Sequence, residues 1–176
     1  MNLFMLRHRV PVLTAFILVA LWGLFTVSSP DTFLHGRIYI SFMSTIPFTA
    51  MLAFALTLLI IAREIDMSFP AVVALGGFVF SQIFELTQSS ILAFGAAIAA
   101  GVVCGILNGT LVVYFRIPSI IATIGTQFFL GGLTTVLADG LALSIPQVRD
   151  SWIHTLMVGR IAEFIPAQVL WALLMV

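Results

Sequence analysis

Residues 104–127 read CGILNGTLVVYFRIPSIIATIGTQ, an almost wholly apolar stretch interrupted by Asn108 and by an Arg-Ile-Pro step. The arginine of that step, Arg116, is of a type that marks the membrane interface. Pro118 can occupy the first position of the next helix, because an N–H at that position would have no helical partner. The stretch therefore predicts two spanning helices joined by a tight, two-residue turn at the membrane surface.

The composition of the whole chain points to lipid as its solvent. Of the 176 residues, 61% are hydrophobic and only 8% are charged, whereas a soluble domain has about 25% charged residues. The net charge is zero, which argues against a nucleic-acid partner. A single cysteine excludes an internal disulfide and a cysteine-based metal cluster.

Five apolar segments are close to the roughly 20 residues that a spanning helix needs. They are Val10–Val27, Ile38–Ala62, Met67–Phe84, Ser90–Phe115 and Ile117–Ala138. A mixed loop over 139–164 has room for a short interfacial helix. The final run, 165–176, is too short to cross a bilayer core of about 30 Å at about 1.5 Å per residue. We expect an all-α polytopic transmembrane bundle of five to six spans, one domain over 1–176, truncated at its C-terminus.

The basic residues near the N-terminus predict the orientation of the chain. Arg7 and Arg9 precede a first apolar run that is too long for a signal peptide and has no clear cleavage site. The run is therefore interpreted as an uncleaved span with a cytoplasmic N-terminus. Alternation of the spans then places Arg63 and Arg116 inside and the 139–164 loop outside.

Small residues recur every fourth position in the fourth predicted span. Ala93, Ala97, Gly101, Gly105 and Gly109 form one stripe with a slow drift around the helix. Small side chains let helix backbones approach closely, which is how helices associate in lipid. The stripe predicts that this helix packs among others, and by itself it says little about transport.

Polar residues within apolar runs need partners. An amide in hydrocarbon costs several kcal/mol unless it is paired, so Asn108 either bonds to another helix or lines a wet cavity. Asp66, at the start of a predicted span, either caps that helix with Ser68 beside it or helps shape a translocation path. The sequence leaves both alternatives open.

Several function classes are excluded or disfavoured by missing motifs. The chain contains no lysine, so it cannot hold the phosphate-binding lysine of a P-loop ATPase. No G-x-S-x-G or H-E-x-x-H motif is present, which argues against a membrane hydrolase. An ion-coupled secondary transporter or channel-like protein remains the alternative to an ATP-driven one, although acidic residues inside the spans would be expected for it.

The opening stretch also resembles a known family. It resembles the sequence pattern of the permease subunits of bacterial sugar ABC importers, in the segments G-I-L-N-G, R-I-P and I-A-T-I-G-T. These importers belong to the ribose, xylose and arabinose group, which is related to the branched-chain amino acid permeases. The steps GGL at 131–133, LSIP at 143–146 and IP at 165–166 also fit. The resemblance covers nearly the whole chain, but only the N-terminal half or so of a family with about ten spans, each of roughly 20 residues.

One stretch departs from the family pattern. Where the family has G-G-I-D-L-S-v-G, this chain reads REIDMSFP over residues 63–70. Asp66 and Ser68 match, whereas the first glycines are replaced by Arg63 and Glu64. Glycine would let the backbone depart from the helical conformation at this point. Pro70 can also interrupt a helix, but it fixes the φ angle.

The resemblance implies a non-catalytic permease subunit in the bacterial inner membrane, importing a monosaccharide or a related small polar solute. Its expected partners are ABC ATPase subunits, a periplasmic solute-binding protein, a second permease subunit and the lipid bilayer; no cofactor or metal is expected. The candidate path or packing residues are Asp66, Ser68, Asn108, Thr123 and Thr126. The coupling segment of the family lies in its second half, so this chain alone is expected not to transport.

Overall fold

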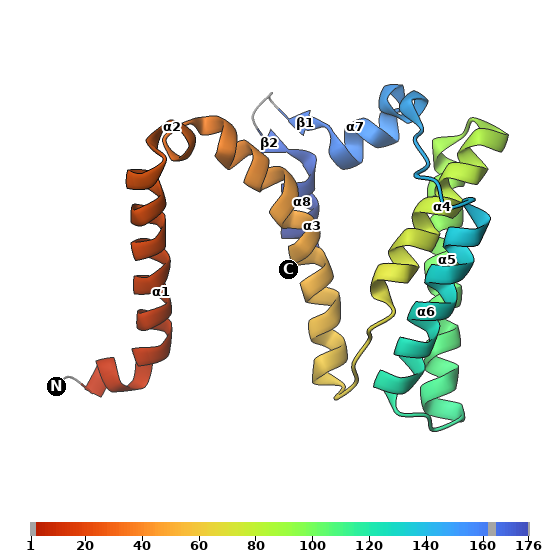
Figure 1. Ribbon diagram of the computed structural model, residues 1–176, viewed down its shortest axis with the longest axis horizontal. Coiled ribbons are helices and arrows are strands. Elements are labelled where there is room, and N and C mark those ends of the chain that lie inside the picture. The colour runs from red at the N-terminus through yellow and green to blue at the C-terminus, as the bar shows by residue number, and fades with distance from the viewer. Residues whose placement is uncertain (1–2, 162–164, 176) are drawn as a thin grey trace. The chain divides into compact units, whose positions relative to one another are not determined.

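The computed structural model describes residues 3–161 and 165–175 and has the predicted all-α architecture (Figure 1). Within these described residues, five helices are long and apolar enough to cross a membrane. Their apolar parts agree with the five predicted segments to within about one helical turn. These parts are Val10–Ser28, Gly36–Ile61, Phe69–Thr87, Ser90–Tyr114 and Ser119–Leu137. The prediction of a polytopic helical membrane protein is confirmed.

The first compact unit ends at Ile46. It contains helix α1 (Leu3–Ser28), the short helix α2 (Pro30–Phe33) and the beginning of α3 (Gly36–Ile61). Trp22 donates from Nε1 to the Tyr39 hydroxyl at 3.2 Å, and that hydroxyl donates to the Phe33 carbonyl at 2.8 Å. The side chains of Arg7 and Arg9, on which the predicted cytoplasmic N-terminus rests, lie outside the described side chains.

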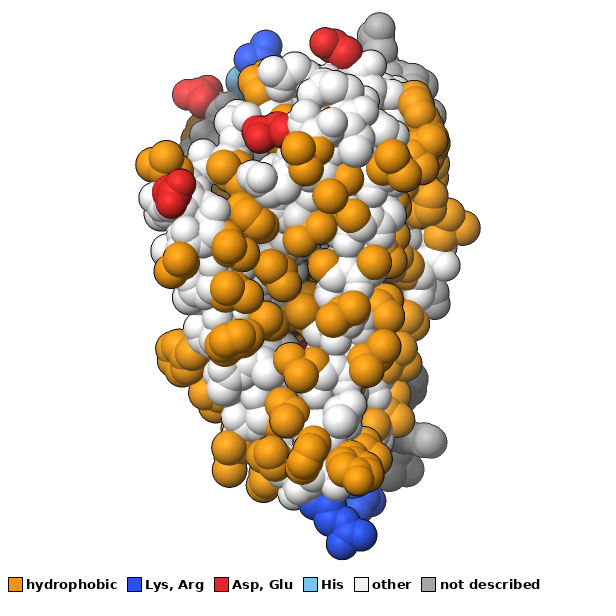
Figure 2. Space-filling view, turned by 90° about the vertical axis from the view of Figure 1, so that its right-hand side faces the viewer, with side chains coloured by type: hydrophobic (Ala, Val, Ile, Leu, Met, Phe, Trp, Pro, Cys, Tyr) orange, Lys and Arg blue, Asp and Glu red, His pale blue; other side chains and the backbone are white. Residues whose placement is uncertain are grey.

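The second unit is built around α4 (Phe69–Thr87), α5 (Ser90–Gly109) and α6 (Ser119–Leu137). Helix α4 packs against both α5 and α6, as Figure 1 shows. The contact is lined by Ala71, Cys104 and Leu130, which are buried, with Val72 and Leu75 beside them. Figure 2 shows hydrophobic side chains spread along the length of one face, with charged side chains towards its two ends, as expected for a protein surrounded by lipid.

The small-residue stripe of α5 does not stay on one face. Ala93 is fully buried, and a Cβ added at Gly76 of α4 would lie 3.9 Å from the Ala97 carbonyl oxygen. Four residues of helix turn by about 400°, so a four-residue stripe drifts by roughly 40° at each step. Gly105 and Gly109 are consequently exposed, and an added Cβ would meet nothing within 4 Å there. Packing of these two glycines against a further helix stays a prediction.

The turn between α5 and α6 differs from the prediction. The helix continues beyond Gly109 as a π-helical segment, η1 (Thr110–Tyr114). Residues 115–118 then connect to α6, with Pro118 at the N-cap and not at the first helical position. The predicted two-residue turn, with Pro118 at the first position of the next helix, is therefore wrong, because η1 ends at Tyr114 and α6 begins only at Ser119.

Left-handed backbone conformations follow four of the long helices. Arg63, Gln88, Arg116 and Asp139 have φ angles between 52° and 61°. At Arg63 the next N–H, that of Glu64, reaches back to the Leu59 carbonyl at 2.9 Å, which is the arrangement of a Schellman cap. Glycine is the usual residue at such a position, so arginine here carries a conformational cost of about 1 kcal/mol.

The C-terminal part contains short elements. The predicted loop holds a 3₁₀ turn, η2 (Pro146–Asp150), and the expected short helix, α7 (Trp152–Val158). Two-residue strands that were not predicted follow, with β1 (Arg160–Ile161) antiparallel to β2 (Ile165–Pro166). The last helix, α8 (Ala167–Met175), is joined to α7 by a 2.9 Å hydrogen bond from Trp171 Nε1 to the Leu156 carbonyl.

Candidate functional site

An unwound stretch, residues 62–68, connects α3 to α4 and carries two of the predicted site residues. Ser68 is completely buried and donates from its hydroxyl to Asp66 Oδ1 at 2.6 Å. Asn108 of α5 donates from Nδ2 to the same Ser68 hydroxyl at 2.7 Å. Asn108, Ser68 and Asp66 therefore form one hydrogen-bonded chain that begins on α5 and ends on the unwound stretch.

The cap predicted for Asp66 is corrected by this geometry. Ser68, not Asp66, is at the N-cap of α4, and its side chain makes no capping hydrogen bond. The Asp66 carboxylate instead accepts from the Ser68 N–H at 2.6 Å and from the Ser68 hydroxyl. The bonds to Asp66 and Asn108 hold the hydroxyl away from the first turn of the helix.

The other side of the stretch lies against α6. Thr123 accepts a hydrogen bond from the Met67 N–H at 3.1 Å and donates to the Ser119 carbonyl at 2.8 Å. Thr126 is buried, but its hydroxyl donates only to the Thr123 carbonyl. The structure thus brings Thr123 to the unwound stretch, whereas the hydrogen bond of Thr126 stays within α6.

Two residues at this site were not among the sequence candidates. Ser119 accepts from the Ile65 N–H at 3.2 Å, and Gln127 accepts from the Ala71 N–H at 3.1 Å. Ser119, Thr123 and Gln127 are four residues apart, which places them on one face of a helix. That spacing is visible in the sequence and could have identified them.

Asn108 retains an unused hydrogen-bonding atom. Its side chain is buried, with 8% of its surface exposed, and its Oδ1 has no hydrogen-bond partner among the described residues. The sequence left open whether Asn108 bonds to another helix or lines a wet cavity. The structure contains a hydrogen bond from Asn108 to Ser68, at the N-cap of α4. The free carbonyl oxygen means that the amide can still accept one or more hydrogen bonds from water, solute or protein.

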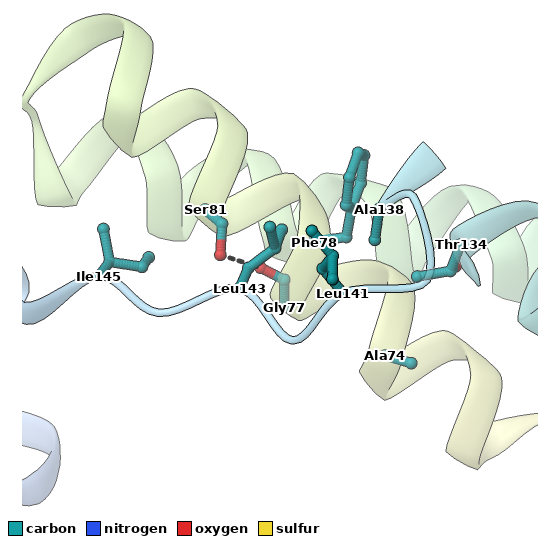
Figure 3. A pocket seen from close by; sticks show the side chains of 9 residues that line it. All are labelled: Ala74, Gly77, Phe78, Ser81, Thr134, Ala138, Leu141, Leu143 and Ile145. Carbon is teal, nitrogen blue, oxygen red and sulfur yellow. Dashed lines mark hydrogen bonds between the residues drawn. The ribbon is translucent and has the colours of Figure 1, made fainter. Parts of the chain in front are cut away.

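A cleft of about 390 Å³ lies beside the middle of α4 (Figure 3). It is formed by α4, α6 and the segment that follows α6, and its lining includes Gly77, Phe78, Ser81 and Thr134. The Ser81 hydroxyl donates to the Gly77 carbonyl at 3.0 Å. The residues that line the cleft do not include Asp66, Ser68 or Asn108. The cleft and the Asn108–Ser68–Asp66 chain are therefore distinct features.

Comparison with known proteins places the chain in a family. Residues 38–176 match the family described as branched-chain amino acid transport system / permease component. The L-arabinose ABC transporter permease protein AraH of Azospirillum brasilense is 26% identical over 133 residues, which are 76% of this chain and 39% of that protein. The ribose import permease protein RbsC of Escherichia coli strain K12 is 28% identical over 123 residues, 70% of this chain and 38% of that protein.

A third relative covers less of the chain. The autoinducer 2 import system permease protein LsrD of Salmonella paratyphi B is 28% identical over 92 residues, 52% of this chain and 27% of that protein. No solved structure matches the chain significantly. The chain therefore spans about two fifths of the length of the first two relatives. Since the family match covers most of its residues, including four of the five apolar helices, this multi-pass chain belongs to the branched-chain amino acid transport system permease family.

Proposed function

We propose that the chain is a permease subunit of an ATP-driven importer for a monosaccharide or a related small polar solute. The family match over residues 38–176 is the observation that carries this proposal. The names of two relatives, which refer to arabinose and ribose, support a monosaccharide. The subunit moves its solute without making or breaking covalent bonds in it.

The polar groups of the site suit a neutral solute. Hydroxyl and amide side chains, such as those of Ser68, Thr123 and Asn108, exchange hydrogen bonds with sugar hydroxyls without requiring a charge on the solute. A few polar groups in an otherwise apolar setting are also what small-molecule sites use to set orientation and specificity. We infer that these three side chains and Asp66 lie along or beside the solute path.

The proposed partners supply the energy and the solute. Two ATPase subunits drive alternation between outward-open and inward-open states of a pathway formed with a second permease subunit. A periplasmic binding protein delivers the solute on the outer side. The location that fits this assembly is the bacterial inner membrane.

Charge at the two ends of the α4–α6 bundle supports an orientation. Ile65 and Ser119 are hydrogen-bonded, so the chain near Arg63 and the turn at Arg116 lie at one end of the bundle. Asp139 follows α6 at the opposite end. Because arginine is enriched on the cytoplasmic side, we propose that the arginine end is cytoplasmic and that the N-terminus is cytoplasmic too.

An uptake assay tests the proposal. The chain spans about two fifths of its relatives, so it is expressed together with a second fragment that supplies the rest of their length. Its cognate ATPase and binding protein are expressed with it, in a strain that lacks its own pentose importers. We expect uptake of radiolabelled D-ribose or L-arabinose above the level of an empty vector, and loss of that uptake when the ATPase carries an inactivating substitution. Pentose uptake that persists with the inactive ATPase would contradict an ATP-driven mechanism.

A further inference from the structure

The first turn of α4 needs a hydrogen-bond acceptor from outside the helix. The first four N–H groups of any α-helix have no acceptor within it. Pro70 has no N–H, and the Val72 N–H reaches the Ser68 carbonyl at 3.1 Å. The Ala71 N–H lies between them on a residue that is 3% exposed, where water has little access. The usual acceptor would be the N-cap side chain, but Ser68 is engaged elsewhere.

Gln127 of α6 provides the missing acceptor. Its Oε1 accepts from the Ala71 N–H at 3.1 Å. The two helices are close enough for this bond because small residues face each other one turn further along. A Cβ added at Gly131 would lie 3.9 Å from the Cβ of Ala71.

The same face of α6 holds the backbone that precedes α4. Ile65 and Met67 are alternate residues of an unwound chain, and alternate residues of an extended chain direct their N–H groups to the same side. Their N–H groups donate to Ser119 and Thr123, at 3.2 and 3.1 Å. Successive turns of α6 therefore present side-chain oxygens where a β-sheet would present the carbonyls of a neighbouring strand.

We propose that Gln127 caps α4 in trans, and that Ser119, Thr123 and Gln127 together form an acceptor row that fixes where the chain is unwound before α4. The three residues are positioning residues for Ser68, since the backbone they hold extends from Ile65 to Ala71 on both sides of it. An unwound backbone within a membrane protein must have its N–H groups satisfied by the protein or by water. The acceptor row meets that requirement for the N–H groups of Ile65 and Met67, and it also satisfies the Ala71 N–H in the first turn of α4. This proposal does not depend on which solute the protein carries.

Amide hydrogen exchange of the purified, full chain in lipid nanodiscs tests the proposal. In the unsubstituted protein the amides of Ile65, Met67 and Ala71 should be protected. Thr123→Val removes the acceptor for Met67, and a typical hydrogen bond corresponds to an exchange about five- to tenfold faster at that amide. Thr135→Val is the matched control, because the Thr135 hydroxyl donates only to the Gly131 carbonyl of its own helix.

Substitutions of Gln127 complete the test. Gln127→Leu should accelerate exchange at Ala71 by a similar factor, and Gln127→Glu, which keeps an acceptor oxygen, should restore protection. If Gln127→Leu does not fold, the exchange rates of Gln127→Glu, Thr123→Val and the unsubstituted protein still test the proposal. Fast exchange at Ile65, Met67 and Ala71 in the unsubstituted protein would overturn the proposal. Equal acceleration of Met67 by Thr123→Val and Thr135→Val would overturn it too.

Discussion

Asn108 and Ser68, 40 residues apart in sequence, are joined by a 2.7 Å hydrogen bond between buried side chains. The bond fixes the C-terminal part of α5 against the start of α4. It continues through the Ser68 hydroxyl to the carboxylate of Asp66. A substitution of any one of these three side chains is therefore expected to disturb the hydrogen bonds of the other two.

The first prediction is an energetic coupling between Asn108 and Ser68. Asn108→Leu and Ser68→Ala should each destabilise the protein, and together they should cost less than the sum of the two. Hydrogen bonds between membrane helices contribute about 0.6 kcal/mol on average and up to about 1.7 kcal/mol, so the coupling should lie in that range. The measurement is a double-mutant cycle on the free energy of unfolding in mixed micelles.

Ser81 provides the control for that cycle. Like Ser68 it is a buried serine, but it lies within α4, and its hydroxyl donates to the Gly77 carbonyl of the same helix. Ser81→Ala combined with Asn108→Leu should be additive. A coupling as large for Ser81 as for Ser68 would mean that the cycle reports general loosening and not the hydrogen bond.

The second prediction separates the two ends of the small-residue stripe. Ala93 is fully buried against its neighbours, so Ala93→Leu should overpack the bundle and cost about 1–3 kcal/mol. Gly105→Leu should leave the α4–α5 contact intact, because an added Cβ meets nothing within 4 Å. Thermal unfolding in detergent compares the two variants, and a larger loss for Gly105→Leu would show that this glycine packs against a helix outside the α4–α6 bundle.

The third prediction concerns the left-handed residue after α3. Arg63 has a φ of 61°, and Arg63→Gly should stabilise the protein by roughly 0.5–1 kcal/mol because glycine adopts this conformation without steric cost. Ala53→Gly in the middle of α3 is the control and should destabilise by about 1 kcal/mol. The comparison is made by thermal unfolding, and destabilisation by both glycines would count against the strain assigned to Arg63.

The fourth prediction is the orientation of the helices. In a Cys104→Ala background, a cysteine at position 139 should react with a membrane-impermeant maleimide in intact cells. A cysteine at position 116 should react only after the cells are permeabilised, because Arg116 and Asp139 lie at opposite ends of α6. Labelling of position 116 but not 139 in intact cells would reverse the proposed orientation.

The spanning helices could be predicted from hydropathy, whereas the place where the chain unwinds could not. The third span was expected at Met67–Phe84 and is observed at Phe69–Thr87. A hydropathy profile includes Met67 and Ser68 in the span because it depends only on the polarity of side chains. It contains no information about which groups accept hydrogen bonds from the backbone N–H groups. Those partners come from α6, more than 50 residues later in the chain.

The site was predicted in part for a similar reason. Polar residues in apolar runs stand out in a sequence, which is why Asp66, Ser68 and Asn108 were candidates, and the structure brings them together. The role of Gln127 depends on which N–H group it meets across a helix contact. Spacing along one helix can indicate a shared face but not the element that the face meets.

The most direct test of the account is solute uptake into proteoliposomes that contain this chain, a second fragment that supplies the rest of its relatives' length, and the ATPase. Binding protein and radiolabelled pentose are supplied on the binding-protein side. The account predicts accumulation that requires ATP and that continues when a protonophore and a sodium ionophore remove the ion gradients. Accumulation driven by a proton or sodium gradient without ATP would contradict it, and would identify the protein as an ion-coupled transporter.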